Sequence, residues 1–298
     1  MDILRAPKAR FRDLPDYPWR PHFVVVDEDD LRMHYIDEGM SGAPTIVMLH
    51  GEPSWSFLYR FMIARCVKAG FRVLAPDLIG FGRSDKFSDP AAYTYARHVG
   101  WVRRWIELLD LNEITLVGQD WGSLIGLRLV AELPDRFARV VIGNGMLPTG
   151  HEKVPAAFHV WRAFAKYTPV FPVAGILQVG TKRRLSRREL AAYRAPFPHR
   201  RHLAGARAFP ELVPTSPEHP GAAANQAAWR VLEQWDKPFL TCFSDGDPIT
   251  RGGDRYMQER IPGAKGLPHR TVRGGHFLQE DSPDEFSDAI IELIHSTS

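Results

Sequence analysis

The chain has 298 residues, of which 44% are hydrophobic and 24% are charged, with a net charge of +3. This balance is typical of a globular protein with a substantial core, and it excludes a disordered or fibrous chain. Two cysteines, Cys66 and Cys242, are too few for a disulfide framework, and both lie in apolar segments typical of a core. No apolar run is long enough to span a bilayer and residues 1–7 contain no signal region, so we expect a cytoplasmic protein without membrane contact.

The first half of the chain alternates between strand and helix patterns. Residues 23–26 and 31–36 alternate as an antiparallel pair of strands would. Continuous apolar runs predict strands buried on both faces of a mainly parallel sheet, at residues 45–49, 71–75, 114–117 and 139–142. Helical spacing of apolar residues predicts helices between them, at residues 57–67, 93–109 and 121–133.

From about residue 147 to residue 228 the strand periodicity disappears. This segment is rich in Pro, Arg, Ala and aromatic residues, and Phe158, Trp161 and Phe164 fall at helical offsets. Prolines interrupt it repeatedly, so we expect several short helices. The strand–helix alternation then resumes, with strands predicted at residues 238–243 and 269–272 and helices at residues 254–260 and 286–294.

These patterns predict an α/β fold, in which a mainly parallel sheet is flanked by helices and carries an inserted helical lid. Residues 1–146 and 229–298 would form the core domain, and residues 147–228 would form the lid. Ligands of open α/β sheets bind at the carboxyl ends of the strands. We therefore expect the functional site at that edge, beneath the lid.

The junction between strand 114–117 and the following helix carries the main chemical signal. Gly118-Gln-Asp-Trp-Gly122 has the form of the nucleophile elbow Gly-x-Ser-x-Gly, with Asp120 in place of the serine. The two glycines allow strand and helix to pack closely around a strained residue whose side chain projects. A carboxylate is a poor nucleophile for acyl transfer, but it can displace a leaving group from a saturated carbon. The alkyl ester of Asp120 formed in this way could be cleaved by water that a histidine activates.

An acid and a histidine follow later strands. Asp247 and His276 complete the order nucleophile, acid, histidine that is expected of an α/β-hydrolase. Asp245 competes for the role of the acid, but Pro248 biases the backbone of Asp247 towards the extended geometry of a strand end, so we favour Asp247. Asn144, at the end of an earlier strand, lacks the charge that would stabilise an imidazolium. Each acid alone is commonly a turn or cap residue, whereas their joint order and placement favour a catalytic triad.

Several motifs match one known family. They are His50-Gly-Glu-Pro-Ser-Trp55, Gly118-Gln-Asp-Trp-Gly122, Asp77-Leu-Ile-Gly-Phe-Gly-Arg-Ser84 and the region of His276. With them the chain resembles the haloalkane dehalogenases of the α/β-hydrolase superfamily over nearly its whole length. It most resembles the subfamily that has the catalytic acid after the later strand and a second halide-binding tryptophan in the lid. The resemblance implies hydrolysis of haloalkanes to alcohol, halide and a proton through a covalent alkyl ester.

The resemblance also implies roles for individual residues. Asp120 would be the nucleophile, His276 the base and Asp247 its partner. The backbone N–H groups of Glu52 and Trp121 would form the oxyanion hole, and the indole N–H groups of Trp121 and Trp161 would bind the halide. Another subfamily has Asn where Glu52 stands and uses it on the halide, so the Glu52 side chain is assigned no such role.

The chemistry of the indole group also favours halide binding by two tryptophans. A departing halide is a large anion, and the Trp indole offers a donor and no acceptor on an apolar body. Trp161 could instead be a packing residue of the lid, and Trp229 and Trp235 are interpreted as packing residues. Candidates for the pocket lining, for which core packing is an equal alternative, are Phe158, Phe164 and Phe209.

Other enzymes of the same fold remain as alternatives. An epoxide hydrolase also has Asp followed by Trp, and its family uses lid tyrosines as acids, for which Tyr167 and Tyr193 are available. A fluoroacetate dehalogenase would carry arginines just after the nucleophile, but Arg128 is too far along, and an esterase is disfavoured because Ser84 is not in an elbow. A rival of another class is a non-catalytic ligand binder of the hydrolase fold, which would be expected to have a broken triad.

The expected partners are a small apolar halogenated substrate and the halide that it releases. No metal-ligand cluster is visible, so no metal or organic cofactor is expected. Basic clusters at residues 182–188 and 199–202 are interpreted as solvated helix faces, with a nucleic-acid patch as the minor alternative. The sequence does not indicate the oligomeric state.

Overall fold

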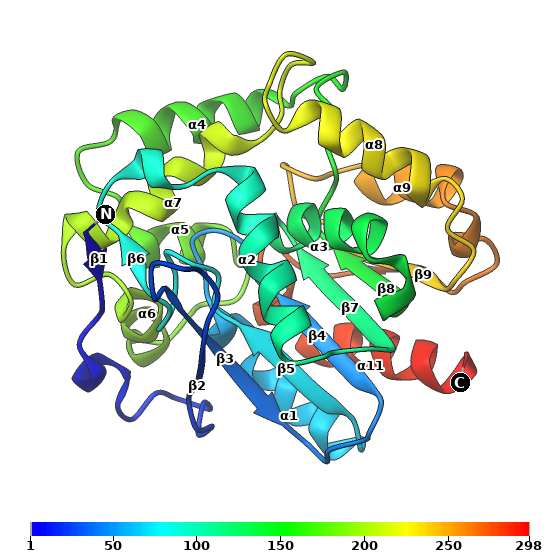
Figure 1. Ribbon diagram of the computed structural model, residues 1–298, viewed down its shortest axis with the longest axis horizontal. Coiled ribbons are helices and arrows are strands. Elements are labelled where there is room, and N and C mark those ends of the chain that lie inside the picture. The colour runs from blue at the N-terminus through cyan, green and yellow to red at the C-terminus, as the bar shows by residue number, and fades with distance from the viewer. Residues whose placement is uncertain (1, 298) are drawn as a thin grey trace.

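The computed structural model describes residues 2–297 and is built around one large sheet (Figure 1). Its eight strands follow the order β10-β9-β8-β7-β4-β5-β3-β2. All pairs are parallel except β2 with β3 and β3 with β5. The strands are β2 (His22–Val25), β3 (Arg32–Glu38), β4 (Thr45–Leu49), β5 (Arg72–Pro76), β7 (Ile114–Gln119), β8 (Phe137–Gly143), β9 (Phe239–Ser244) and β10 (Arg270–Val272).

This architecture confirms the predicted fold class, including the antiparallel pair at one edge and the mainly parallel centre. The apolar run at residues 45–49 coincides with β4, because a strand covered on both faces needs an apolar side chain at nearly every position. A second, small sheet pairs β1 (Ile3–Leu4) with β6 (Lys86–Phe87). It was not predicted, since strands of two residues are too short to show a period.

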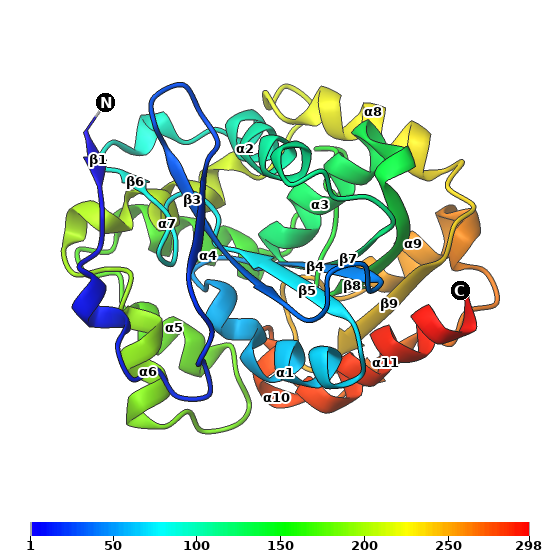
Figure 2. The same ribbon diagram turned by 60° about the horizontal axis from the view of Figure 1, so that its bottom comes forward.

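Helices cover both faces of the large sheet (Figure 2). On one face α1 (Arg60–Lys68) packs against α11 (Pro283–Ser296), and on the other α3 (Trp121–Glu132) packs against α2 (Tyr95–Leu108) and α8 (Ala222–Leu232). Helix α2 begins two residues later than predicted, because the Thr94 hydroxyl accepts the backbone N–H of Arg97 and caps the helix there. Two further helices accompany the C-terminal strands, α9 (Gly253–Arg260) and α10 (Leu278–Asp281).

The segment expected to be a lid is helical, as predicted, and in Figure 1 its green-to-yellow ribbon runs along the top and left of the molecule. Its helices are α4 (Ala156–Tyr167), α5 (Val173–Val179), α6 (Arg187–Arg194) and α7 (Ala204–Ala208), followed by α8. Pro155 and Pro172 immediately precede α4 and α5, where a missing N–H costs no helical hydrogen bond. Helix α8 runs past residue 228, the expected end of the lid, and the division into two domains stays a prediction.

A continuous apolar core joins the sheet to this helical segment. It contains strand residues such as Val47 and Val141 together with Leu177 and Tyr193 of the helical segment. Cys66 and Cys242 are buried, as expected, and burial raises the pKa of both thiols to about 12. Within residues 2–297 no helix is long and apolar enough to cross a membrane.

Candidate active site

Asp120 stands at the turn between β7 and α3 with a backbone conformation that L-residues rarely adopt, φ 51° and ψ −123°. The surrounding packing holds it there. A Cβ on Gly122 would lie 1.8 Å from the carbonyl oxygen of Leu49, and one on Gly118 would lie 2.9 Å from that of Gly122. Gly122 is therefore required by the close approach of α3 to β4, and Gly118 by the close approach of α3 to β7. The result is a side chain that projects from the carboxyl end of the sheet.

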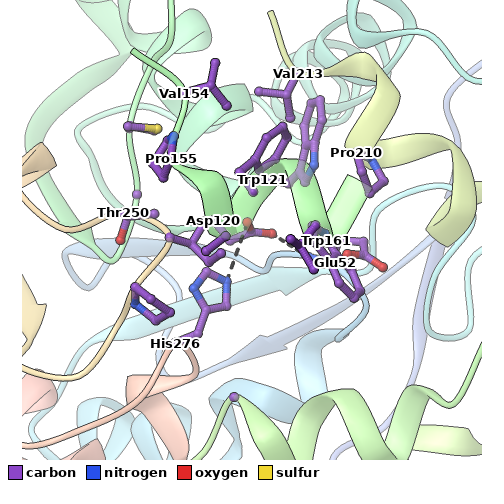
Figure 3. Close-up of a pocket in the computed structure, with 18 of the residues that line it drawn as sticks. Glu52, Asp120, Trp121, Val154, Pro155, Trp161, Pro210, Val213, Thr250 and His276 are labelled. Carbon is purple, nitrogen blue, oxygen red and sulfur yellow. Dashed lines mark hydrogen bonds and ion pairs between the residues drawn. The ribbon is translucent and has the colours of Figure 1, made fainter. Parts of the chain in front are cut away.

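Two groups contact the Asp120 carboxylate from opposite sides (Figure 3). The backbone N–H of Glu52 donates to Oδ1 at 2.7 Å, and Nε2 of His276 lies 3.6 Å from Oδ2. A Cβ on Gly51 would lie 2.3 Å from Oδ1, so Gly51 makes the room for the carboxylate. The backbone N–H of Trp121 begins α3 and has no partner inside the helix.

The peptide group that joins Gly51 to Glu52 is fixed by hydrogen bonds to its carbonyl oxygen. That oxygen accepts from the hydroxyl and N–H of Ser54, at 2.8 and 3.1 Å. It also lies 2.9 Å from Nδ1 of His50. Because the N–H of Leu78 donates to Nε2 of His50, the proton of this imidazole is on Nδ1 and points at the carbonyl. The N–H of the same peptide is thereby aimed at Asp120.

His276 is hydrogen-bonded to Asp247, with 3.1 Å between Nδ1 and Oδ2. Asp247 is buried and also accepts the N–H of Ile249 at 2.9 Å and the hydroxyl of Thr250 at 2.5 Å. Burial alone would raise the pKa of Asp247, but the charge of His276 and these donors outweigh it and lower that pKa to about 2. Asp247 is therefore ionised and oriented, whereas Asp245 faces elsewhere, towards Lys182 and the N–H of Gly274.

Two carboxylates act on the protonation of His276. Burial lowers its pKa, but Asp247 and Asp120 together raise it well above the ordinary value. The amide nitrogen of Gln119 also lies 3.1 Å from Nε2 of His276. The same nitrogen lies 3.2 Å from the His276 carbonyl oxygen, which can only accept, so the amide presents a donor to the ring. Gln119 occupies a variable position of the elbow motif, and no feature of the sequence identified it.

The Glu52 side chain is buried beside the nucleophile, and its Oε1 has no hydrogen-bond partner within residues 2–297. Burial raises its pKa well above the ordinary value, and the charge of Asp120 raises it further. Burial and the charge of Asp120 therefore both disfavour the ionised form of Glu52.

Asp120 and His276 open into a cavity of about 620 Å³ with a mainly apolar lining. Trp121, Trp161, Phe158 and Phe164 all line it, and the first two are drawn with Asp120 in Figure 3. Neither indole nitrogen has a hydrogen-bond partner in the described part of the chain. Trp161 packs against Phe164, with ring centroids 5.8 Å apart, and therefore belongs to the aromatic wall contributed by α4.

Phe209 was a candidate for the pocket lining, but it does not line the cavity. It is fully buried behind Trp121, with ring centroids 4.4 Å apart, and its neighbour Pro210 reaches the cavity instead. Phe209 thus takes the alternative of core packing and supports the indole of Trp121. Trp229 and Trp235 are buried packing residues, as interpreted, and Trp229 donates to the carbonyl of Leu147.

The two tyrosines considered as acids for an epoxide hydrolase lie away from the site. Tyr167 is 75% exposed on α4, and Tyr193 is fully buried with its hydroxyl on Glu280. Neither lines the cavity. The basic cluster at residues 182–188 is also only partly a solvated face, because Arg183 binds the carboxylates of Glu189 and Glu280.

Known proteins resemble this chain in sequence and in fold. A family model described as the alpha/beta hydrolase fold matches residues 44–283. A haloalkane dehalogenase of Mycobacterium marinum is 54% identical over 98% of this chain and 99% of its own length, and one of Psychrobacter cryohalolentis is 52% identical over 99% of both. Among solved structures, the tetrameric haloalkane dehalogenase DpaA of Paraglaciecola agarilytica has a TM-score of 0.89 and 34% identity, covering 97% of each chain.

The chain belongs to the α/β-hydrolases, the class that its sheet order and its elbow define. Within that class it is a member of the haloalkane dehalogenase family. The resemblance predicted from the motifs is confirmed, and the protein is a hydrolase that acts on carbon–halide bonds.

Proposed function

We propose that haloalkanes are hydrolysed at the Asp120 site by two successive displacements. In the first, an oxygen of Asp120 attacks the halogen-bearing carbon in line, the carbon–halogen bond breaks with its electron pair leaving on the halide, and an alkyl ester forms. The indole N–H groups of Trp121 and Trp161 stabilise the negative charge that develops on the halide. The observation that carries this proposal is a strained carboxylate between the Glu52 N–H and His276, at the floor of an apolar cavity.

In the second displacement water cleaves the ester. His276 takes a proton from the water, whose oxygen attacks the carboxyl carbon of Asp120. The N–H groups of Glu52 and Trp121 stabilise the oxyanion, and collapse of the intermediate expels the alkoxide, which takes up a proton to give the alcohol. Asp247 holds the ring of His276 by Nδ1 and stabilises the imidazolium. The products are the alcohol, the halide and a proton, and Asp120 is regenerated.

The electrostatics couple the two steps. In the free enzyme the charges of Asp247 and Asp120 raise the pKa of His276, which favours the imidazolium. Alkylation neutralises Asp120 and removes one of these charges, so the pKa of His276 falls in the ester intermediate. The base becomes available when there is an ester to hydrolyse.

The cavity supports a small apolar substrate. Its volume of about 620 Å³ lies within the roughly 300–1,000 Å³ of ordinary ligand pockets, and its wall is aromatic and aliphatic. Two alternatives are less well supported. The lid tyrosines that an epoxide hydrolase would use lie outside the cavity, and a non-catalytic binder would have no reason to assemble Asp120, His276 and Asp247. The cytoplasmic location expected from the sequence stays a prediction.

Halide release tests the proposed function. The purified chain should release bromide from 1-bromobutane and 1,2-dibromoethane, measured with an ion electrode, and Asp120→Ala should release none. Turnover of an epoxide without bromide release from the haloalkanes would favour the epoxide hydrolase. Absence of both activities would favour the binder.

A covalent intermediate gives a second test. In His276→Ala the ester should form and persist, so intact-mass measurement after incubation with 1-bromobutane should show one butyl group on the protein. A protein that released bromide yet carried no adduct would contradict the two-step scheme.

A further inference from the structure

The loop that carries His276 is held firmly on its core side. The side-chain amide of Asn144 donates to the carbonyl oxygens of Gly275 at 2.9 Å and of His276 at 3.0 Å. The hydroxyl of Ser244 donates to the carbonyl of Gly275 at 2.7 Å. These contacts come from the ends of β8 and β9, so the sheet fixes one side of the loop.

Its other side rests on residues 180–183, which follow α5 in the helical segment. The N–H of Phe277 donates to the carbonyl of Gly180 at 3.0 Å. The two backbones approach too closely for side chains: a Cβ on Gly275 would lie 2.4 Å from the carbonyl oxygen of Gly180, and a Cβ on Gly180 would lie 2.6 Å from the ring of Phe277. A shift of this helical-segment loop would therefore be transmitted to His276.

One carboxylate joins the two loops. Asp281, the last residue of α10, accepts the N–H of Gly275 at 2.8 Å and the N–H of Lys182 at 2.9 Å on Oδ2. Its Oδ1 accepts the N–H of Arg183 at 2.8 Å. Asp281 thus binds the residue before His276 and two residues of the helical segment, with three charge-assisted hydrogen bonds to backbone N–H groups.

A buried ionic cluster fixes this arrangement to the core. Arg183 binds Glu189 of α6 and Glu280, the neighbour of Asp281. Arg60 of α1, whose side chain is completely buried, pairs with the same two carboxylates at 2.8 and 2.6 Å. Moving the 180–183 loop would unpair buried charges, which is costly. The loop is therefore a rigid support for the bridge made by Asp281.

We propose that Asp281 is a positioning residue for His276, and that it ties the placement of this base to the helical segment. The inference rests on the function proposed above and extends it to a residue outside the cavity. Its effect falls on one step only, because His276 is required for hydrolysis of the Asp120 ester and not for its formation. Loss of the bridge leaves the attack of Asp120 on the haloalkane intact and slows the attack of water.

The test measures formation and hydrolysis of the Asp120 ester separately in the variant Asp281→Asn. The amide nitrogen of Asn must face a backbone N–H, so at least one of the three hydrogen bonds is lost. With 1-bromobutane in rapid mixing, the burst of bromide should keep its rate within about twofold, while ester hydrolysis slows roughly 10- to 100-fold, as a displacement of about 1 Å can cause. Intact mass should then show the butyl-enzyme as the major species during turnover.

Asp288→Asn is the matched control. It removes a carboxylate from α11 that pairs with Arg65 at the surface, and both steps should remain as in the wild type. Gly180→Ala probes the same coupling from the other side, since its Cβ meets the ring of Phe277, and it should reproduce the selective loss of hydrolysis.

The outcomes are distinct. Selective slowing of hydrolysis supports the role of Asp281, whereas wild-type rates of both steps, or equal slowing of both, overturn it. If Asp281→Asn does not fold, Gly180→Ala is judged by the same criteria. A wild-type enzyme that released no bromide would instead contradict the proposed function itself.

Discussion

Replacing Asp247 by Asn changes the charge beside His276 while keeping the shape of the side chain. The Asp247 Oδ2 lies 3.1 Å from Nδ1 of His276, and the charge centres of such a pair lie about 4 Å apart, where unit charges interact by about 4 kcal/mol at an effective dielectric constant of about 20. This energy corresponds to about a thousandfold in rate. The backbone N–H groups of Ile249 and Thr250 donate to Oδ1 and Oδ2 of Asp247, one to each, so the Asn amide cannot satisfy both.

The loss of rate in Asp247→Asn should appear only in hydrolysis of the ester. Rapid mixing with 1-bromobutane should show a bromide burst near one equivalent followed by turnover about a thousandfold slower than in the wild type, with the butyl-enzyme dominant by intact mass. Asp254→Asn, in the first turn of α9, is the control and should behave as the wild type. The reasoning would be refuted if Asp247→Asn kept turnover within about tenfold of the wild type, or if the bromide burst disappeared.

Three further changes test other parts of the site. Trp161→Phe keeps an aromatic ring against Phe164 but removes an N–H, so halide release should slow roughly 10- to 150-fold, as expected for a hydrogen bond to a charged group of about 1.5–3 kcal/mol; an unchanged burst rate would remove Trp161 from the halide site. Glu52→Gln keeps the shape of a side chain whose ionised form is disfavoured by burial and by the charge of Asp120, so kcat should stay near the wild-type value at pH 7, whereas a large loss would show that an ionised Glu52 is needed. The pKa of about 2 for Asp247 against its ordinary 3.8 predicts about 2 kcal/mol of stability that is present above pH 4 and lost as the pH falls towards 2. The gap in Tm between the wild type and Asp247→Asn, measured from pH 6 to pH 2, should therefore narrow below pH 4, and a constant gap would contradict it.

The sequence predicted best those features that depend on local patterns. Continuous apolar runs located the central strands, because a position covered on both faces tolerates few polar residues. The pattern at residues 118–122 located the elbow, since the close approach of α3 to β4 admits only glycine at Gly122. Pro248 favoured Asp247 over Asp245 as the partner of the histidine, and in the structure Asp247 is hydrogen-bonded to His276.

Features that depend on distant contacts were beyond the sequence. Arg183 was interpreted as part of a solvated basic face, yet it lies in a loop and its partners Glu189 and Glu280 come from helices α6 and α10, so no helical spacing links them. Phe209 was a candidate for the pocket lining, but the packing of its ring on Trp121 turns it away from the cavity. Gln119 reaches His276 across 157 positions of sequence, and a polar residue beside a nucleophile carries no distinctive signal.

The contact of Thr250 with Asp247 could have been predicted from the sequence. An Asp that caps the following backbone commonly accepts the N–H groups two and three residues later, and Asp247-Pro-Ile-Thr250 has the form of such a turn. The hydroxyl of Thr250 then reaches the same carboxylate. The pattern identifies a residue that orients Asp247 and so acts on His276 indirectly.

The origin of the alcohol oxygen tests the central claim most directly. In a single turnover with excess enzyme in ¹⁸O-water, the account predicts that 1-butanol released from 1-bromobutane contains ordinary oxygen, because that atom comes from Asp120. The peptide that contains Asp120 should gain ¹⁸O from the attacking water. Alcohol labelled with ¹⁸O and an unlabelled Asp120 would show that water attacks the haloalkane directly, and would contradict the covalent mechanism.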